Sequence, residues 1–304
     1  MKTKIRFIEN RWKFAFLSIF LMAASLYFIF VRGLSYGVDF NGGVKLIYQF
    51  DKEVDEAGIR KALEGGAYQN AEVIRFDAEN KSETKFLIKL KYEEGAKPSE
   101  EITSELGSAL GAENIKLLSE EIVGPKVGSE LKTKAIFAIV LSSLLILIYV
   151  GFRFDFIFAP GAVVALVHDV LISVGVFAFS GREFDLTILA AILTIIGYSI
   201  NDTIVIYDRI RENIRNQAST TPLTQIVNQS LNETLSRTII TSLTVFFSVV
   251  ILFIFGGDLL RGFALCMIVG TIAGSYSTLF IASPIYLFLQ RKFPTQGMAK
   301  GKKI

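Results

Sequence analysis

Six long apolar stretches dominate the sequence, and they limit its possible folds more than any other feature. Hydrophobic residues make up 51% of the chain while 20% of residues are charged, so the two kinds must occupy separate segments. An α-helix of about 20 apolar residues crosses a hydrocarbon core about 30 Å thick. The sequence therefore predicts an α-helical integral membrane protein with six transmembrane helices. These cover residues 14–31, 135–152, 156–179, 185–206, 238–256 and 263–289.

Basic residues gather at one set of helix ends, and this predicts the orientation of the chain. Lys and Arg near the ends of transmembrane helices favour the cytoplasmic side. Only Arg182 and Arg261 mark the opposite loops. We therefore predict that both termini are cytoplasmic. The basic residues on that side are Lys2, Lys4, Arg6, Arg11, Lys13, Arg153, Arg209, Arg211, Arg215, Arg237, Arg291, Lys292, Lys300, Lys302 and Lys303.

Four parts of the chain follow from this orientation. Residues 1–33 are predicted to form the cytoplasmic N-terminus and the first transmembrane helix, which lacks a cleavage site and so favours an uncleaved anchor. Residues 34–131 form a domain outside the cytoplasm. Residues 132–290 hold helices two to six with a cytoplasmic loop at about 207–237, and residues 291–304 form a basic cytoplasmic tail.

The predicted outer domain has the pattern of a small α/β fold. Its order, β-α-β-β-α-β, predicts a ferredoxin-like domain between transmembrane helices one and two. That arrangement alone fixes no function. The strand-like segments are residues 44–50, 71–76, 85–91 and 115–118. The helix-like segments run from Asp55 to Glu64, closed by Gly65 and Gly66, and from Ser99 to Leu110, closed by Gly111.

Two glycine-rich junctions, residues 37–43 and 123–128, bracket this domain. The first contains Asn41-Gly42-Gly43, which lacks the GK[ST] ending of a phosphate-binding loop and precedes no predicted helix. We therefore predict a tight turn or hinge at the membrane surface.

Ionisable residues inside the predicted membrane helices need an explanation, because each costs roughly 2.5–3.5 kcal/mol on insertion scales. Asp169, with His168 beside it, lies on a face that repeats Gly161, Ala165 and Ser173 at four-residue steps. We interpret His168 and Asp169 either as a second functional polar cluster or as a hydrogen-bonded pair that holds this helix against its neighbours.

Asp202 and Arg237 form the second candidate group, on helices four and five. A carboxyl group in lipid can exchange between its neutral and charged forms near neutral pH, so a helix movement that changes the Asp–Arg distance would load and release a proton. The alternative is a static salt bridge that joins two helices. Both interpretations remain open on the residues alone. The polar residues around the pair are Tyr198, Asn201, Thr203 and Thr241.

Two further segments bear on packing and on coupling. Gly270 and Gly274 form a GxxxG pattern, which predicts close helix packing. After helix four, the charged residues Asp208, Arg209 and Glu212 either anchor the orientation or transmit motion between helices four and five. Residues 223–231 are predicted to form an amphipathic helix on the membrane surface.

Enzyme signatures are absent from the sequence. It has no GxSxG, HExxH or Walker A motif, and its only histidine is His168. With a single cysteine, Cys266, it offers no metal site, and no cofactor is expected. Basic residues in so apolar a chain are expected to meet lipid headgroups rather than nucleic acid.

A family resemblance adds to this reading. The segment from Gly197 to Asn213, GYSINDTIVIYDRIREN, resembles the fourth-helix signature of SecF, a protein-export membrane subunit of the SecD/SecF family. Residues 37–43, GVDFNGG, resemble the start of its outer domain, and residues 123–128, His168-Asp169 and Ser236-Arg237-Thr238 also match.

The resemblance implies a function and partners. SecF proteins belong to the proton-driven RND superfamily, pair with the six-helix protein SecD, and assist export of unfolded polypeptide through the SecY/SecE/SecG translocon. By motif, Asp202 corresponds to the family's relay acid and Arg237 to its partner arginine. The expected location is a bacterial or archaeal plasma (inner) membrane, with the main domain periplasmic or extracellular. Two other functions remain: an RND exporter of small molecules or lipids, and a passive assembly subunit.

Overall fold

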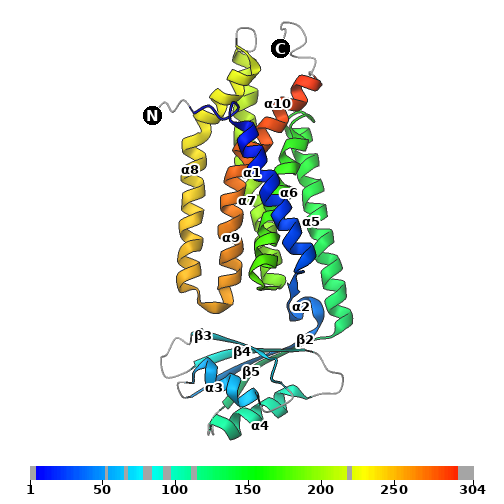
Figure 1. Ribbon diagram of the computed structural model, residues 1–304, viewed down its shortest axis with the longest axis vertical. Helices are drawn as coiled ribbons and strands as arrows, with labels where there is room; N and C mark the ends of the chain where they lie inside the picture. Colours follow the sequence, from blue (N-terminus) through cyan, green and yellow to red (C-terminus); the bar gives the residue numbers. More distant parts are fainter. Residues whose placement is uncertain are drawn as a thin grey trace.

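The computed structural model describes residues 5–51, 54–64, 68–77, 84–91, 97–110, 115–217 and 221–293. These form an elongated helical bundle with a small α/β domain at one end (Figure 1). Several predicted features lie outside the described residues: the turn at Gly65-Gly66, Gly111, and the basic residues Lys2, Lys4, Lys300, Lys302 and Lys303. Of the predicted tail, only residues 291–293 are described.

Six helices of the described chain are long and apolar enough to cross a membrane, as predicted from the apolar stretches. Because their backbone hydrogen bonds are made within each helix, such segments suit an apolar surrounding. They are α1 (Arg11–Val31), α5 (Pro125–Arg153), α6 (Ala159–Ser180), α7 (Leu186–Gln217), α8 (Leu223–Phe255) and the continuous segment α9 (Gly257–Ser277), η1 (Thr278–Ala282) and α10 (Ser283–Lys292).

The second spanning helix is longer than predicted, because α5 begins at Pro125 rather than at residue 135. Gly124 occupies the N-cap and Pro125 the first turn. Proline is favoured there, since its fixed φ suits the helix and its missing N–H would have had no partner. The predicted limit of the outer domain at residue 131 therefore falls inside α5.

The fifth helix also departs from the prediction. The helix expected at residues 223–231 is present but not separate, because it is the first part of α8, one helix of 33 residues that begins at Leu223. Ile226, Val227 and Leu231 are buried, with at most 1% exposed, so they pack inside the protein rather than on a membrane surface. No glycine or proline interrupts α8. In the predicted loop at about 207–237, the described residues up to Gln217 belong to α7 and those from Leu223 belong to α8.

The last spanning segment is not α-helical throughout, because it contains a π-helical turn. Residues Thr278–Ala282 form the π-helical turn η1. Pro284 follows at the start of α10. Since proline has no N–H and clashes with the carbonyl four residues earlier, it disturbs the preceding turn. The Ser283 hydroxyl satisfies the Thr278 carbonyl, at 3.1 Å.

The GxxxG pattern packs α9 against α7, so the predicted close packing is confirmed within the chain. A Cβ atom at Gly270 would lie 2.2 Å from Ile195 Cδ1, and one at Gly274 would lie 3.1 Å from Ser199 Cβ. Only glycine permits this approach. Ser199 is thereby brought beside α9 in the middle of the bundle.

The first helix is held by contacts with segments far along the chain. Backbone N–H groups of Ile5 and Phe7 donate to the side-chain oxygens of Asn232 and Asn228 at the start of α8, each at 2.8 Å. Further along α1, the Ser18 hydroxyl lies 2.9 Å from the Tyr276 hydroxyl. The lipid-facing side of α1 is otherwise open: 6% of its most apolar window is buried.

The α/β domain lies between α1 and α5 in the chain. Its antiparallel sheet has the order β3-β4-β2-β5, and Leu46, Ile88 and Ile102 are fully buried between sheet and helices. Figure 1 shows both long helices of the domain on the face of the sheet turned away from the bundle. The elements are β2 (Gly43–Phe50), α3 (Glu56–Leu63), β3 (Glu72–Asp77), β4 (Thr84–Lys91), α4 (Pro98–Leu110) and β5 (Ile115–Val123).

Short elements connect this domain to the bundle. Strand β1 (Ser35–Tyr36) pairs in parallel with β6 (Glu183–Phe184), which joins α6 to α7. The one-turn helix α2 (Val38–Asn41) follows, and its Asp39 accepts a 3.1 Å hydrogen bond from the Leu186 N–H at the start of α7. Gly42 has φ +80°, and a Cβ there would lie 3.0 Å from Pro125. The predicted tight turn at this junction is confirmed.

An ion pair between Lys89 and Glu183 fixes the sheet to the α6–α7 connection. The Lys89 ammonium lies 2.8 Å from Glu183 and 2.9 Å from Glu72, and Lys89 is only 9% exposed. Burial lowers the pKa of Lys89, but its hydrogen bonds to Glu183 and Glu72 outweigh burial, and the pKa is raised above its ordinary 10.5. The stabilisation is therefore fully present below pH 10.5 and is lost as the pH rises through the raised pKa.

Replacing Lys89 with methionine should loosen the domain, because Glu72 and Glu183 would then face each other without a cation. We expect a loss of about 1–3 kcal/mol in docking free energy. Spin labels at Asp51→Cys in the domain and Phe255→Cys in α8 would report a broader distance distribution, and buried Cys266 stays unlabelled. Lys91→Met on the same strand, exposed and unpaired among the described ion pairs, is the control. Equal distributions for both variants would contradict the prediction.

Candidate functional site

Asp202 of α7 faces α8 and is 2% exposed. Its Oδ1 accepts a 3.3 Å hydrogen bond from the Thr241 hydroxyl. That hydroxyl also lies 2.9 Å from the Arg237 carbonyl oxygen, and it has only one proton to donate. Asp202 Oδ2 is buried without a hydrogen-bond partner in the part of the chain that the structure describes. The carboxyl group is therefore buried with too few donors, which calls for a functional explanation.

Arg237 lies one turn before Thr241 on α8, and its side chain is exposed. No guanidinium nitrogen of Arg237 comes within 4.0 Å of an Asp202 oxygen, although its charge acts on that carboxyl through space. The static salt bridge that the sequence also allowed is thus not formed in this structure. The two residues lie on facing helices with a gap between their charges.

The polar side chains that follow Arg237 form a seam on the exposed face of α8. Thr241, Thr244 and Ser248 each donate to a carbonyl oxygen three or four residues earlier in the same helix. Thr244 and Ser248 are exposed, as is Arg237. A cation among hydroxyl groups is an unfavourable surface for contact with lipid tails.

Asp169 of α6 joins three helices in the centre of the bundle, and it is completely buried. One carboxylate oxygen, Oδ1, lies 2.9 Å from His168 Nδ1. The other, Oδ2, accepts hydrogen bonds from Ser199 of α7 at 2.7 Å and from Ser277 of α9 at 2.8 Å. The predicted His168–Asp169 pair is therefore present, and it connects α6 to both neighbours.

The π-helical turn η1 extends this contact towards the end of the bundle opposite the α/β domain. Thr203 lies 3.2 Å from Thr278, hydroxyl to hydroxyl, and Tyr207 donates to the Ala282 carbonyl at 3.2 Å. Gly161 of α6 leaves room for this arrangement, since a Cβ there would lie 2.5 Å from the Tyr207 hydroxyl. One face of α7 thus hydrogen-bonds η1 and packs against α9 and against Tyr286 of α10, and another carries Asp202.

Arg209 connects α7 to α8 at the bundle end far from the α/β domain. Its guanidinium binds Glu212 on its own helix and Glu233 on α8, each at 2.6 Å. Asn213 adds a 2.8 Å hydrogen bond to Glu233. Asp208 is exposed and lies 3.7 Å from Arg211. Of the three predicted coupling residues, only Arg209 reaches the neighbouring helix.

The remaining predicted neighbours of Asp202 are divided between different surfaces. Tyr198 has its hydroxyl buried beside Ser242 and Ser275, one turn from Asp202. Thr203 faces η1 rather than Asp202. Asn201 is exposed. The structure therefore brings Tyr198 and Thr241 to the Asp202 side of α7 and does not bring Asn201 or Thr203 there.

Comparison with known proteins places the chain in a family. Residues 103–292 match the family described as "Protein export membrane protein SecD/SecF, C-terminal", and residues 27–54 match the "SecD/SecF GG Motif". The protein translocase subunit SecF of Calditerrivibrio nitroreducens is 40% identical over 293 residues, covering 95% of each chain. The chain belongs to the SecF family. SecF of Vibrio alginolyticus is also 40% identical, over 92% of this chain and 88% of the relative.

Solved structures of SecDF share the fold of this SecF-family chain. A SecDF from Thermus superposes with a TM-score of 0.78 at 34% identity, over 94% of this chain. SecDF in a super-membrane-facing form gives 0.73 at 33% identity over 99%. The chain spans 39% and 41% of these two SecDF chains. The SecF-family chain is thus a multi-pass membrane protein that matches part of each of these longer SecDF chains.

Several residues of the SecF-family site escaped the sequence analysis. Ser199 and Ser277 supply the donors for Asp169, and Glu233 receives Arg209 from 24 residues away. Serines in apolar helices give little signal, because their hydroxyls are often satisfied by the preceding turn. The four-residue step from Gly270 to Gly274 was the available hint, since it turns Ser277 towards α7.

Replacing Asp169 with leucine should destabilise the bundle. Ser199, Ser277 and His168 would each lose a buried partner, and we expect a loss of about 1–3 kcal/mol in unfolding free energy. Asp169→Asn should lose less, because its amide oxygen still accepts from the serines. Thermal unfolding in detergent measures the effect. Ser173→Ala is the control, since that hydroxyl bonds only the Asp169 carbonyl of its own helix. An unchanged unfolding temperature in the leucine variant would refute the structural role.

Proposed function

We propose that this chain is an auxiliary subunit of the Sec protein-export machinery, which acts with SecD and uses the proton motive force to assist polypeptide translocation through, and release from, the SecY/SecE/SecG channel. Its support is the family membership, with relatives named protein translocase subunit SecF and solved neighbours named SecDF. The geometry adds a specific observation: a buried carboxyl group, Asp202, that lacks donors and faces a nearby but unpaired arginine.

Asp202 is the proposed relay acid, with Arg237 as its partner. In the present arrangement one oxygen of Asp202 has a single shared donor and the other has none, which suits a neutral carboxyl better than a carboxylate. Once the proton leaves, the carboxylate needs donors or a cation; Ser242 of α8 lies beside it as a further hydroxyl donor, and Arg237 supplies the cation on the facing helix. Proton release would therefore draw α7 and α8 together, and proton uptake would let them part.

Contacts at both ends of α7 support a mechanical link to the α/β domain. At one end Asp39 holds the first N–H of α7, and Glu183 just before it binds Lys89 of the sheet. At the other end Arg209 binds Glu233 of α8. A shift of α7 against α8 at Asp202 would therefore be felt by the domain at the other end of the helix, about 24 Å away along α7.

The seam on α8 supports a partner on that face. Arg237, Thr244 and Ser248 are exposed there, and a protein surface with polar groups would accept them better than lipid does. We assign this face to SecD, because the SecDF chains are more than twice as long as the part that this chain matches. The proposed site then includes residues of the partner.

The domain assignments and location form part of the same proposal. Residues 34–131, corrected to end before Pro125, would form the ferredoxin-like domain outside the cytoplasm, supported by the sheet order β3-β4-β2-β5. Residues 1–33 and 291–304 would be cytoplasmic. The basic residues at the bundle end far from this domain support that orientation in a plasma membrane.

Asp202→Asn tests the relay. We expect export of a secreted precursor into inverted vesicles to fall to the rate measured without a proton motive force, because the amide cannot exchange a proton, while co-purification with SecD persists. Asp258→Asn, in the exposed first turn of α9, is the control and should export normally. Normal export in Asp202→Asn would exclude the relay and leave a passive assembly subunit. If Asp202→Asn lost SecD, Arg237→Lys would repeat the test.

The nature of the transported molecule needs a second experiment, because an RND-type exporter of small molecules remains the competing function. We expect a photo-crosslinker on the exposed strand β5, at Leu118, to capture a translocating precursor, since this surface faces solvent. The same crosslinker at buried Leu46 is the control and should capture nothing. Movement of small molecules without capture of polypeptide would favour the exporter.

A further inference from the structure

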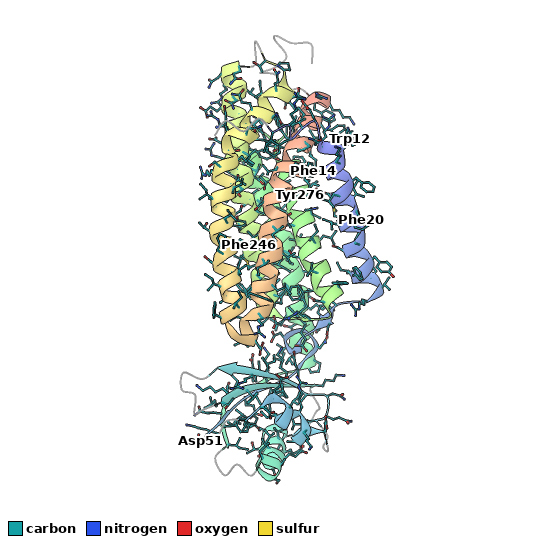
Figure 2. All side chains as sticks on the ribbon, turned by 60° about the vertical axis from the view of Figure 1, so that its left-hand side comes forward. Trp12, Phe14, Phe20, Asp51, Phe246 and Tyr276 are labelled. Atoms are coloured by element: carbon teal, nitrogen blue, oxygen red, sulfur yellow. The ribbon has the colours of Figure 1, made fainter. Side chains whose placement is uncertain are left out.

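A groove with a volume of about 400 Å³ runs between α1 and α10, with α6 and η1 as its floor. Its walls are almost entirely apolar, and Trp12 and Phe288 are exposed at its rim, at 74% and 64%. Figure 2 shows Trp12 near the bundle end far from the α/β domain. The groove belongs neither to the Asp202 site nor to the seam on α8.

The groove has the length of one lipid acyl chain in a single leaflet. On α1 the groove extends from Arg11 to Met22, which lie eleven positions apart, or about 16 Å along the helix. Half of a hydrocarbon core about 30 Å thick is about 15 Å. The residues of α1 that line it, Arg11, Trp12, Ala15, Ser18, Ile19 and Met22, share one helix face.

Two cations stand at the same end of this groove. Arg11 begins α1 and Arg291 lies in the last turn of α10. Arg11 donates to the Ile8 carbonyl at 3.1 Å, and neither arginine has an acidic partner within 4.0 Å among the described residues. Residues 294–304 contain no Asp or Glu that could pair with them. The groove thus combines an apolar trough with two unneutralised charges at the level where lipid headgroups lie.

We propose that this groove binds one anionic phospholipid, with its phosphate between Arg11 and Arg291 and one acyl chain along α1 and α10. The phosphate supplies the negative charge that the chain itself does not provide, and arginine suits phosphate through paired N–H donors. Trp12 at the rim has the place of an interfacial aromatic residue. A neighbouring apolar helix in the groove would instead cover two cations that have no acidic partner among the described residues.

The bound lipid would fill the space between the first and last helices. Most of the α1 surface outside its contact with α6 is open to the surroundings, so a lipid that contacts both α1 and α10 adds to the contacts that hold α1. The structure therefore assigns to the lipid a stabilising role that depends on its headgroup charge.

Native mass spectrometry of the purified full chain tests this proposal, with phosphatidylglycerol and phosphatidylcholine as probes. We expect phosphatidylglycerol to bind at least tenfold more tightly than phosphatidylcholine and to raise the unfolding temperature more. Arg11→Gln with Arg291→Gln should weaken phosphatidylglycerol binding at least tenfold. The matched control is Lys13→Gln with Lys292→Gln, which removes the same charge from the same helices outside the groove lining and should bind like the parent.

A second variant separates loss of the site from loss of folding. Ala15→Trp fills the groove while both arginines remain, and it should abolish tight binding of phosphatidylglycerol. Parental affinity in Ala15→Trp would overturn the proposal. Equal binding of phosphatidylglycerol and phosphatidylcholine by the parent would also overturn it, because the groove would then bind lipid without regard to headgroup charge. An equal loss of binding in the lysine control would overturn it as well, because general surface charge would then explain the binding.

Discussion

A helix bundle surrounded by hydrocarbon has to satisfy its polar side chains from within, since no water is available to do so. Asp169 shows how this chain meets that constraint. Its carboxylate takes donors from His168, Ser199 and Ser277, so a charge that would be costly alone becomes the point where α6, α7 and α9 meet. Ser199 lies one turn before Asp202 on α7. The position of the proposed relay acid therefore depends on a second carboxyl group that has all the partners it needs.

The two buried carboxyl groups differ in their supply of donors, and this difference separates a structural role from a proposed functional one. Asp169 receives bonds on both oxygens, whereas Asp202 shares one hydroxyl with a backbone carbonyl and leaves its other oxygen unbonded. An ionisable side chain that lacks hydrogen-bond partners in one conformation is the kind of group that responds when the conformation changes. The glycine contacts of α9 with α7 fix one side of α7, so the α7–α8 contact is the side left to adjust.

Local patterns predicted much of this architecture, and tertiary contacts explain the remainder. Apolar runs located six spanning helices, and the strand and helix periods gave the element order of the outer domain. The start of α5 was misplaced because Lys132 and Lys134 resemble loop residues, although Pro125 already permits a helix. The amphipathic character of residues 223–231 does not reveal that they continue into α8, nor that Asn228 and Asn232 bind the backbone of residues near the N-terminus. The Lys89–Glu183 pair joins residues that are 94 positions apart in the sequence, and helix and strand periodicity give no information over such a separation.

Those two asparagines have a consequence for how the chain is made. The backbone of Ile5 reaches its partner only after residue 232 has been synthesised, and Ser18 waits for Tyr276. The first helix packs against α6 as soon as that helix has been made, but its bonds to residues 232 and 276 form only when nearly the whole chain has emerged from the ribosome. Its apolar surface on all sides suits that wait, since a helix with a polar face would be unstable in lipid before its neighbours arrive. The last bonds to form are thus those that connect the oldest helix to α8 and α9.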